Sequence, residues 1–269
     1  MSDPKPDALF AGASLRASLF RPNDAVDRLL VTFRPMTDAA GRFEAPRPVK
    51  RFLARGWSHL YLQSFRNDWY VNADTAPLSA QLSALAAGFA YRAAIGFSMG
   101  GYAALRLSEA LRLDHVIAVS PQVSIAPSVA PFETRYSEEA KGFDAGLGDL
   151  GLHARRGLRG VVLFDPFRRI DRLHAEAIAG VLPDLEMCRM VFGGHPATSV
   201  LRETIGFGAV QELLLDGRAT RSEVLKLHRA ARAQAPSYWT ECATACRRHR
   251  RAEAAEAALV CRAALEARP

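Results

Sequence analysis

The stretch Gly96-Phe97-Ser98-Met99-Gly100 carries the strongest structural signal in this chain. Residues 91–95 before it are short and largely apolar, as in a buried strand, and residues 101–111 after it are rich in helix formers. A strand, a sharp turn that holds a serine, and a helix together expose the serine hydroxyl at the turn. Such a turn strains the backbone, and glycines on both sides of the serine avoid collisions with the strand and the helix. We therefore expect Ser98 to be a nucleophile.

Strand and helix signals alternate through most of the chain up to about residue 208. This alternation predicts an α/β fold, with a mainly parallel twisted sheet that carries helices on both faces. The apolar and alternating runs place the expected strands at 14–20 (at a sheet edge), 28–33, 59–63, 91–95, 115–119, 160–165 and 189–192, and helices at 49–55 and 78–87.

Two segments depart from this alternation. Residues 121–157 contain three prolines and several glycines between two strands, which predicts a lid or a variable insertion. No strand signal remains after the domain at 1–208, so we expect 209–269 to be a C-terminal helical extension. Its expected helices at 236–247 and 252–265 resemble a single tetratricopeptide-type hairpin. We expect this hairpin to pack on the main domain; a docking face for a protein partner is the alternative.

Charge and cysteine content narrow the class of protein. The 269 residues are 49% hydrophobic, which is enough for a sizeable core, and the net charge of +7 comes mostly from arginines. No nucleic-acid-binding signature accompanies this charge, so we do not expect nucleic-acid binding. None of the four cysteines belongs to a C-x-x-C pair, and we expect reduced thiols and no metal site. The polar N-terminus, with no apolar run of membrane-spanning length, leads us to expect a cytoplasmic protein without a membrane span.

An acid and a histidine follow the serine in the chain. Asp165 ends the strand predicted at 160–165, and His195 follows the strand predicted at 189–192. This order of serine, acid and histidine, each just past a strand, resembles the α/β-hydrolase superfamily. The resemblance covers roughly residues 14–208. It implies a serine esterase that cleaves a carboxylic ester or thioester of a small-molecule or acyl substrate, without metal or organic cofactor.

The resemblance also implies a role for each side chain. His195 would take the proton from Ser98 as an acyl-serine forms, and Asp165 would hold the imidazole in the correct tautomer. Asp171 is the alternative acid, although it also suits the cap of a helix that begins near it. His174 is the rival histidine.

An oxyanion hole needs two backbone N–H donors. By resemblance, one is the N–H of Met99, directly after the nucleophile. The other comes from the loop after the strand at 28–33, where Pro35 has no N–H to donate. We expect Arg34 to supply this donor, with Met36 as the alternative.

A polar and aromatic cluster follows the strand predicted at 59–63 and reaches the same edge of the sheet. We expect Asn67, Trp69 and Tyr70 to line the substrate pocket. The alternative is that the two aromatic rings pack under the lid while Asn67 and Asp68 form a turn. A catalytic Asp68 is a third interpretation.

Two other functions fit the same residues. An acyltransferase would use the same triad and differ only in the group that accepts the acyl chain. A non-catalytic hydrolase-like scaffold would bind a protein partner through its helical extension, because a fold by itself does not fix a function.

Overall fold

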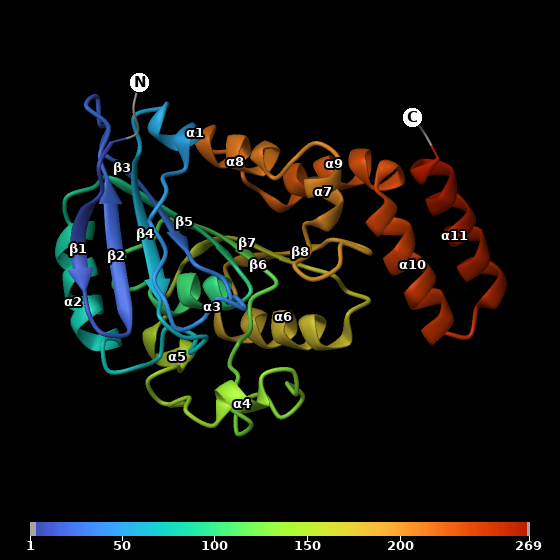
Figure 1. Ribbon diagram of the computed structural model, residues 1–269, viewed down its shortest axis with the longest axis horizontal. Coiled ribbons are helices and arrows are strands. Elements are labelled where there is room, and N and C mark those ends of the chain that lie inside the picture. Colours follow the sequence, from blue (N-terminus) through green and yellow to red (C-terminus); the bar gives the residue numbers. More distant parts are fainter. Residues whose placement is uncertain (1–3, 268–269) are drawn as a thin grey trace.

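The computed structural model describes residues 4–267. Their strands form one eight-stranded sheet (Figure 1). Residues 1–3 of the polar N-terminus and 268–269 lie outside the described part. The strand order is β1-β2-β4-β3-β5-β6-β7-β8; β2 pairs antiparallel with β1 and β4, and all other neighbours pair parallel. This confirms the predicted α/β class. The strands are β1 (Asp7–Ala11), β2 (Leu15–Phe20), β3 (Arg28–Phe33), β4 (Ser58–Ser64), β5 (Tyr91–Phe97), β6 (His115–Val119), β7 (Arg159–Phe164) and β8 (Leu185–Arg189).

Helices cover both faces of the sheet. One face packs against α2 (Thr75–Ala86), α3 (Met99–Arg106) and α6 (Arg169–Val181). The other face packs against α1 (Lys50–Leu53), α7 (Ser199–Glu203), α8 (Gly208–Leu215) and α9 (Arg221–Ala231). The segment 121–157 contains two short helices, α4 (Ser137–Ala140) and α5 (Leu150–His153).

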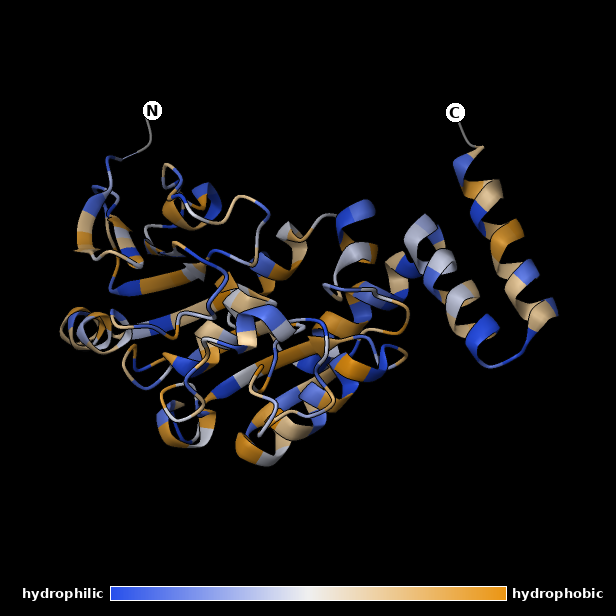
Figure 2. Ribbon diagram, turned by 60° about the horizontal axis from the view of Figure 1, so that its bottom comes forward, coloured by the Kyte–Doolittle hydropathy of each residue, from blue (hydrophilic) through white to orange (hydrophobic). Residues whose placement is uncertain are grey.

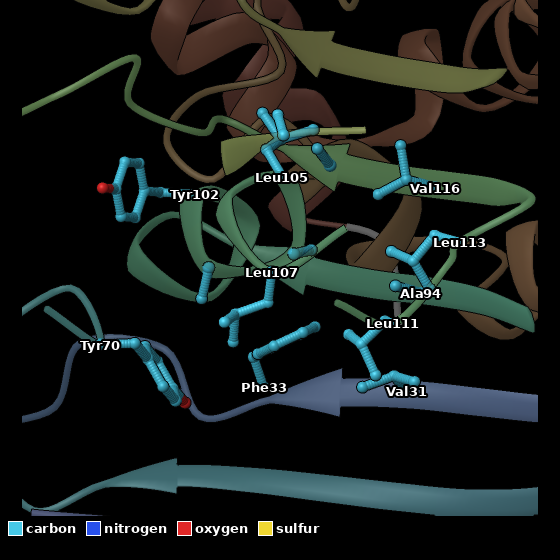
Figure 3. Packing of buried hydrophobic residues seen from close by; sticks show 14 of the residues in the cluster. Val31, Phe33, Tyr70, Ala94, Tyr102, Leu105, Leu107, Leu111, Leu113 and Val116 are labelled. Atoms are coloured by element: carbon cyan, nitrogen blue, oxygen red, sulfur yellow. The ribbon is translucent and has the colours of Figure 1, made fainter. Parts of the chain in front are cut away.

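The two cores follow from the two-residue period of the strands. In β3, Leu29, Val31 and Phe33 belong to the core on the face of α3, whereas Leu30, between Leu29 and Val31, belongs to the core on the opposite face. Figure 3 shows Val31 and Phe33 packed against Leu107 and Leu111, which lie in the segment directly after α3. Each large apolar side chain buried in this way contributes roughly 1.5–3 kcal/mol. A strand that is apolar on both sides is therefore stable only inside a covered sheet.

The sequence prediction misplaced two parts of the sheet. The partly exposed strand β1 has no clear apolar period and was not predicted; it forms the edge, so that β2 lies inside the sheet. The last strand is Leu185–Arg189 and not 189–192. Phe192 has a φ of 54°, in the left-handed region that a strand excludes, whereas Leu185 and Cys188 face the two cores.

The C-terminal helices divide into two groups. Leu214 of α8 and Val224 of α9 belong to the same buried cluster as the strands. In contrast, α10 (Pro236–Arg248) and α11 (Ala252–Glu266) pack mainly on each other, and this hairpin stands apart from the sheet (Figures 1 and 2). The two predicted helices are confirmed; their likeness to a tetratricopeptide-type hairpin and the domain boundary at residue 208 stay predictions. No helix within residues 4–267 has both the length and the apolar composition needed to cross a membrane.

The turn from β5 into α3 depends on two glycines. Ser98 has φ 48° and ψ −118°, a conformation that L-residues rarely adopt. A Cβ atom on Gly96 would lie 2.1 Å from the carbonyl oxygen of Gly100, and one on Gly100 would lie 3.0 Å from Cβ of Phe33. The backbones approach too closely for any side chain at Gly96, as the sequence pattern predicted.

We expect Gly96→Ala to lower the free energy of unfolding by about 3 kcal/mol or more, because the methyl group meets backbone atoms that cannot move independently. Urea denaturation measures this change. Gly180→Ala on α6 is the matched control: a Cβ there meets nothing within 4 Å, and the exchange should stabilise the helix by about 0.5–1 kcal/mol. A Gly96→Ala protein as stable as the unaltered one would contradict this account of the turn.

Candidate active site

Ser98 lies in the wall of a cavity of about 760 Å³ at the edge where the parallel strands end. This volume lies within the range of small-molecule sites. His195 and Tyr136 share the cavity wall with Ser98, so residues from three distant parts of the chain meet there. The remaining lining residues are Pro35, Met36, Thr37, Asp38, Phe97, Pro196, Arg202 and Phe207.

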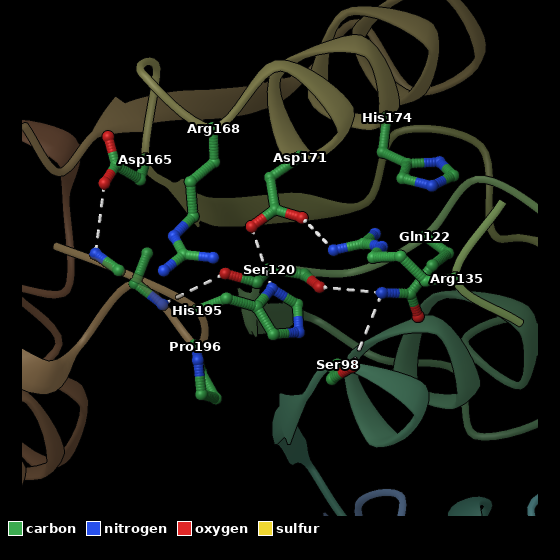
Figure 4. A network of polar contacts seen from close by, with 12 residues as sticks. Ser98, Ser120, Gln122, Arg135, Asp165, Arg168, Asp171, His174, His195 and Pro196 are labelled. Atoms are coloured by element: carbon green, nitrogen blue, oxygen red, sulfur yellow. Dashed lines mark hydrogen bonds and ion pairs between the residues drawn. The ribbon is translucent and has the colours of Figure 1, made fainter. Parts of the chain in front are cut away.

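The imidazole of His195 is held by Asp171. Nδ1 of His195 lies 2.8 Å from Oδ2 of Asp171, which is the third residue of α6 and whose side chain is 1% exposed. In Figure 4 the ring lies between Asp171 and Ser98, with its other nitrogen on the side of Ser98. Since a carboxylate only accepts, Nδ1 carries a proton, and in the neutral ring Nε2 is then the acceptor.

The expected pairing of Asp165 with His195 is corrected by these contacts. Asp165 is fully buried, and its carboxylate accepts hydrogen bonds from the N–H groups of Phe167 (2.9 Å) and Gly194 (3.1 Å). Burial raises the pKa of Asp165, and these two bonds lower it in part. Asp165 therefore fixes the backbone beside His195, while Asp171, the alternative acid, contacts the imidazole. The carboxylate that contacts His195 lies in the first turn of α6, beyond the end of the strand that carries Asp165.

A second network surrounds Asp171. Its Oδ1 accepts a bond of 2.7 Å from Nη1 of Arg135, a residue of the 121–157 segment. Burial raises the pKa of Asp171, but the hydrogen bond and charge of His195, with those of Arg135, outweigh it, so this pKa lies below its usual value. Arg135 also pairs with Glu133 at 2.6 Å, and Glu133 lies 2.8 Å from Nε2 of His174. The rival histidine His174 thus contacts Glu133 rather than Asp171.

One expected oxyanion donor is not available. The N–H of Arg34 donates to the carbonyl of Leu62 at 2.9 Å, because the ladder between β3 and β4 continues one residue past Phe33. Met36, the alternative, lines the cavity, and its N–H has no acceptor among residues 4–267. Met99 is the first residue of α3, where the helix supplies no acceptor for its N–H. The expected donor Met99 and the alternative donor Met36 therefore each have a backbone N–H without an acceptor in the described part of the chain.

The expected substrate residues do not line this cavity. Trp69 and Tyr70 are fully buried; the Tyr70 hydroxyl donates to the carbonyl oxygens of Arg34 and Leu62. Asn67 binds the backbone of Thr37 through both its amide oxygen (3.1 Å) and its nitrogen (3.0 Å). Tyr70 and Asn67 thus support the loop that carries Met36, whereas Trp69 donates to Gln122. None of the three lines the cavity that holds Ser98.

Several residues at the site were missed by the sequence analysis. Gln122 is fully buried; its Nε2 donates to Oγ of Ser98 at 3.4 Å, and its Oε1 accepts from Nε1 of Trp69 at 2.9 Å (Figure 4). The hydroxyl oxygen of Ser120 accepts a hydrogen bond from the N–H of Ala197 at 3.0 Å, which links the end of β6 to the loop that carries His195. Both lie within three residues of the end of β6, and their position at the end of a parallel strand was the signal available in the sequence.

Metal-binding groups are a separate question. The described part of the chain contains no cluster of three or more His, Cys, Asp or Glu residues arranged to hold a metal ion. Its four cysteines are free, and Cys188 is buried in the core.

Comparison with known proteins shows the fold. No family model and no curated protein matches the sequence. Among solved structures, Est1E from Butyrivibrio proteoclasticus superposes with a TM-score of 0.51 and 12% identity, over 80% of this chain and 100% of that chain. The capsule O-acetyltransferase of Neisseria meningitidis serogroup A gives 0.48 and 13%, over 68% and 85%. A putative thioesterase from Silicibacter sp. tm1040 gives 0.48 and 17%, over 72% and 78%. The strand order and the likeness to Est1E show that the fold is that of the α/β hydrolases.

The buried Glu133 predicts a pH-dependent share of stability. Burial raises the pKa of Glu133, but hydrogen bonds from His174 and Arg135 lower it by more. The pKa therefore falls from the usual 4.5 to about 2. Because this pKa is lower in the folded than in the unfolded state, the ionised carboxylate stabilises the folded protein above pH 4.5. This stabilisation is lost as the pH falls to about 2. We compare the free energy of unfolding of the unaltered protein with that of Glu133→Gln. The advantage of the unaltered protein should be up to about 3 kcal/mol larger at pH 6 than at pH 2.

Urea denaturation across this pH range measures the difference. Glu138→Gln, at a residue on the surface of α4, is the control and should show little change with pH. A constant difference between Glu133→Gln and the unaltered protein would contradict the assignment.

Proposed function

We propose that this chain is a serine hydrolase that cleaves a carboxylic ester or thioester through an acyl-serine intermediate. One observation carries the proposal: the Nδ1 of His195 is bound to a buried carboxylate, and the same imidazole faces the cavity that holds Ser98 on its strained turn. In this proposal Ser98 is the nucleophile, His195 the base and Asp171 the acid. The shared fold with Est1E is compatible with it.

In the first half-reaction, Nε2 of His195 takes the proton of Ser98 as its Oγ attacks the acyl carbonyl. Asp171 accepts the Nδ1–H bond throughout, so it favours the imidazolium that forms. The carbonyl oxygen becomes an oxyanion, which the N–H groups of Met99 and Met36 stabilise. As the carbonyl re-forms, the bond to the leaving alcohol or thiol breaks, and the imidazolium returns its proton to that group.

The second half-reaction repeats these roles with water. His195 removes a proton from water as the water oxygen attacks the acyl-serine, and it then gives the proton to Oγ of Ser98. The free acid leaves and the resting site is restored. An acyltransferase would put an alcohol or amine in place of water. Release of free acid without any added acceptor would distinguish hydrolysis from acyl transfer.

The cavity sets the character of the substrate. Phe97 and Phe207 meet edge to face at 4.9 Å and, with Met36, form an apolar wall. Arg202 and Asp38 add charge on the same cavity. A substrate with an apolar acyl chain fits this wall, since the largest share of binding energy in such sites comes from apolar contact.

A fluorophosphonate probe tests the nucleophile and separates the two acids. The probe should label the unaltered protein, and Ser98→Ala should abolish labelling. Asp171→Asn should lower the labelling rate roughly 10,000-fold, because an amide supports the wrong tautomer of the imidazole. Asp165→Asn should cost far less, since it removes a backbone contact only. A folded, unlabelled wild-type protein would favour a non-catalytic scaffold, and loss of activity in Asp165→Asn alone would refute the choice of acid.

Met36→Pro tests the second oxyanion donor, since proline lacks the N–H. We expect kcat for ester hydrolysis to fall roughly 100- to 1,000-fold, the effect of losing one such donor. Met36→Leu keeps the N–H and an apolar side chain of similar size, so it is the matched control and should keep most of the activity. Equal kcat in the two variants, measured with a panel of acyl esters of increasing chain length, would show that another group binds the oxyanion.

A further inference from the structure

The segment 121–157 reaches into the candidate triad through one side chain. Arg135 places Nη1 2.7 Å from Oδ1 of Asp171, while Oδ2 of the same carboxylate is bound to His195 at 2.8 Å (Figure 4). Each carboxylate oxygen thus has one strong, charge-assisted or polar partner. Rotation of the Asp171 side chain away from His195 would break both contacts.

Arg135 is itself held from behind. Its Nε and Nη2 bind the carboxylate of Glu133 at 3.0 and 2.6 Å, and its own N–H donates to Glu133 at 2.8 Å. The guanidinium also lies over the ring of Tyr136, 5.1 Å from its centre. Since Glu133 and Asp171 are each 1% exposed, the guanidinium has little freedom between them.

Glu133 is fixed in turn by α6. The N–H of Val123 donates to Nδ1 of His174 at 3.1 Å, which leaves the ring proton on Nε2, and Nε2 lies 2.8 Å from Glu133. His174 is one helical turn after Asp171 on α6. Two contacts therefore join one face of α6 to the loop that precedes α4: Asp171 with Arg135, and His174 with Glu133.

The charges in this network change during the proposed reaction. With both histidines neutral, the two carboxylates and one guanidinium sum to one negative charge. When His195 accepts the proton of Ser98, the sum becomes zero. Without Arg135, the resting site would hold two negative charges, which would favour the imidazolium before any substrate is bound.

We propose that Arg135 is a positioning residue that fixes the Asp171 carboxylate against His195 and balances its charge. The inference rests on the proposed function for its catalytic consequence, but the effect of Arg135 on His195 is a property of the resting protein. It also makes the 121–157 segment part of the site and not only a cover over it.

The test compares Arg135→Gln with Arg135→Lys. Gln keeps one donor and removes the charge, whereas Lys keeps the charge. In Arg135→Gln the imidazolium of His195 is favoured, so the acid limb of the fluorophosphonate labelling rate should move to higher pH by roughly one pH unit. The rate at pH 6 should fall by up to about tenfold as a result. In Arg135→Lys the limb should stay in place, and only the plateau should fall.

Two further variants keep the test decisive. Arg135→Gln leaves Glu133 without its guanidinium partner, although His174 still contacts it. The double variant Glu133→Gln/Arg135→Gln again holds one negative charge in the resting network, so its acid limb should return toward that of the unaltered protein. Arg172→Gln is the matched control: it removes an arginine of α6 that forms an exposed pair with Glu176, and it should leave the profile unchanged.

The titration of the His195 ring, followed by NMR, gives a readout that needs no catalysis. Its midpoint should move to higher pH in Arg135→Gln and not in Arg172→Gln. If it does so in a protein that no probe labels, the proposed function fails and the role of Arg135 stands. If midpoint and rate profile both match the unaltered protein, Arg135 is structural and the inference is overturned.

Other charged groups near His195 also contribute to the electrostatic potential at its ring. Asp165 binds the N–H of Gly194, and Arg168 pairs with Glu241 of α10, so the variants at Arg135 and Arg172 remove none of these contacts. The other titratable and charged groups that face the network or the cavity are Glu133, Tyr136, His174, Arg202 and Asp38.

Discussion

The close approach of two backbone segments at the turn between β5 and α3 is the constraint on which the site depends. The carbonyl of Gly100 lies against Gly96, and Ser98 is held at a φ of 48°. Such strain costs about 1–3 kcal/mol and persists only where the surroundings determine it. Here β5 lies between β3 and β6, and α3 is buried along its length. The position of the Ser98 hydroxyl is thus set by the centre of the sheet.

The other side chains of the site come to this serine because parallel strands end at one edge. Gln122 follows β6, Asp171 follows β7 and His195 follows β8, so the loops that carry them converge there. Burial makes the charges among them costly unless each is partnered. Arg135 meets this need between Glu133 and Asp171, and the network binds the 121–157 segment to α6.

The order of a serine, an aspartate and a histidine after strand ends could be predicted, but which aspartate contacts His195 could not. A position directly after a strand favours Asp165, yet its carboxylate is used by the N–H groups of Phe167 and Gly194. The choice depended on the direction of one side chain in the first turn of α6. Arg34 failed for a similar reason: the sheet ladder uses its N–H, and the sequence does not say where a ladder ends.

The sequence by itself determined the α/β class, the glycine-dependent turn at Ser98 and the histidine loop, because these depend on local patterns: apolar periods, steric limits and the order of elements. Only the tertiary structure decided that Asp171 contacts His195, that Trp69 and Tyr70 are buried supports, and that Arg135 and Glu133 belong to the site. These are contacts between residues far apart in the chain. A hydrogen bond a few ångströms long is decided by how helices and loops pack, which local sequence does not encode.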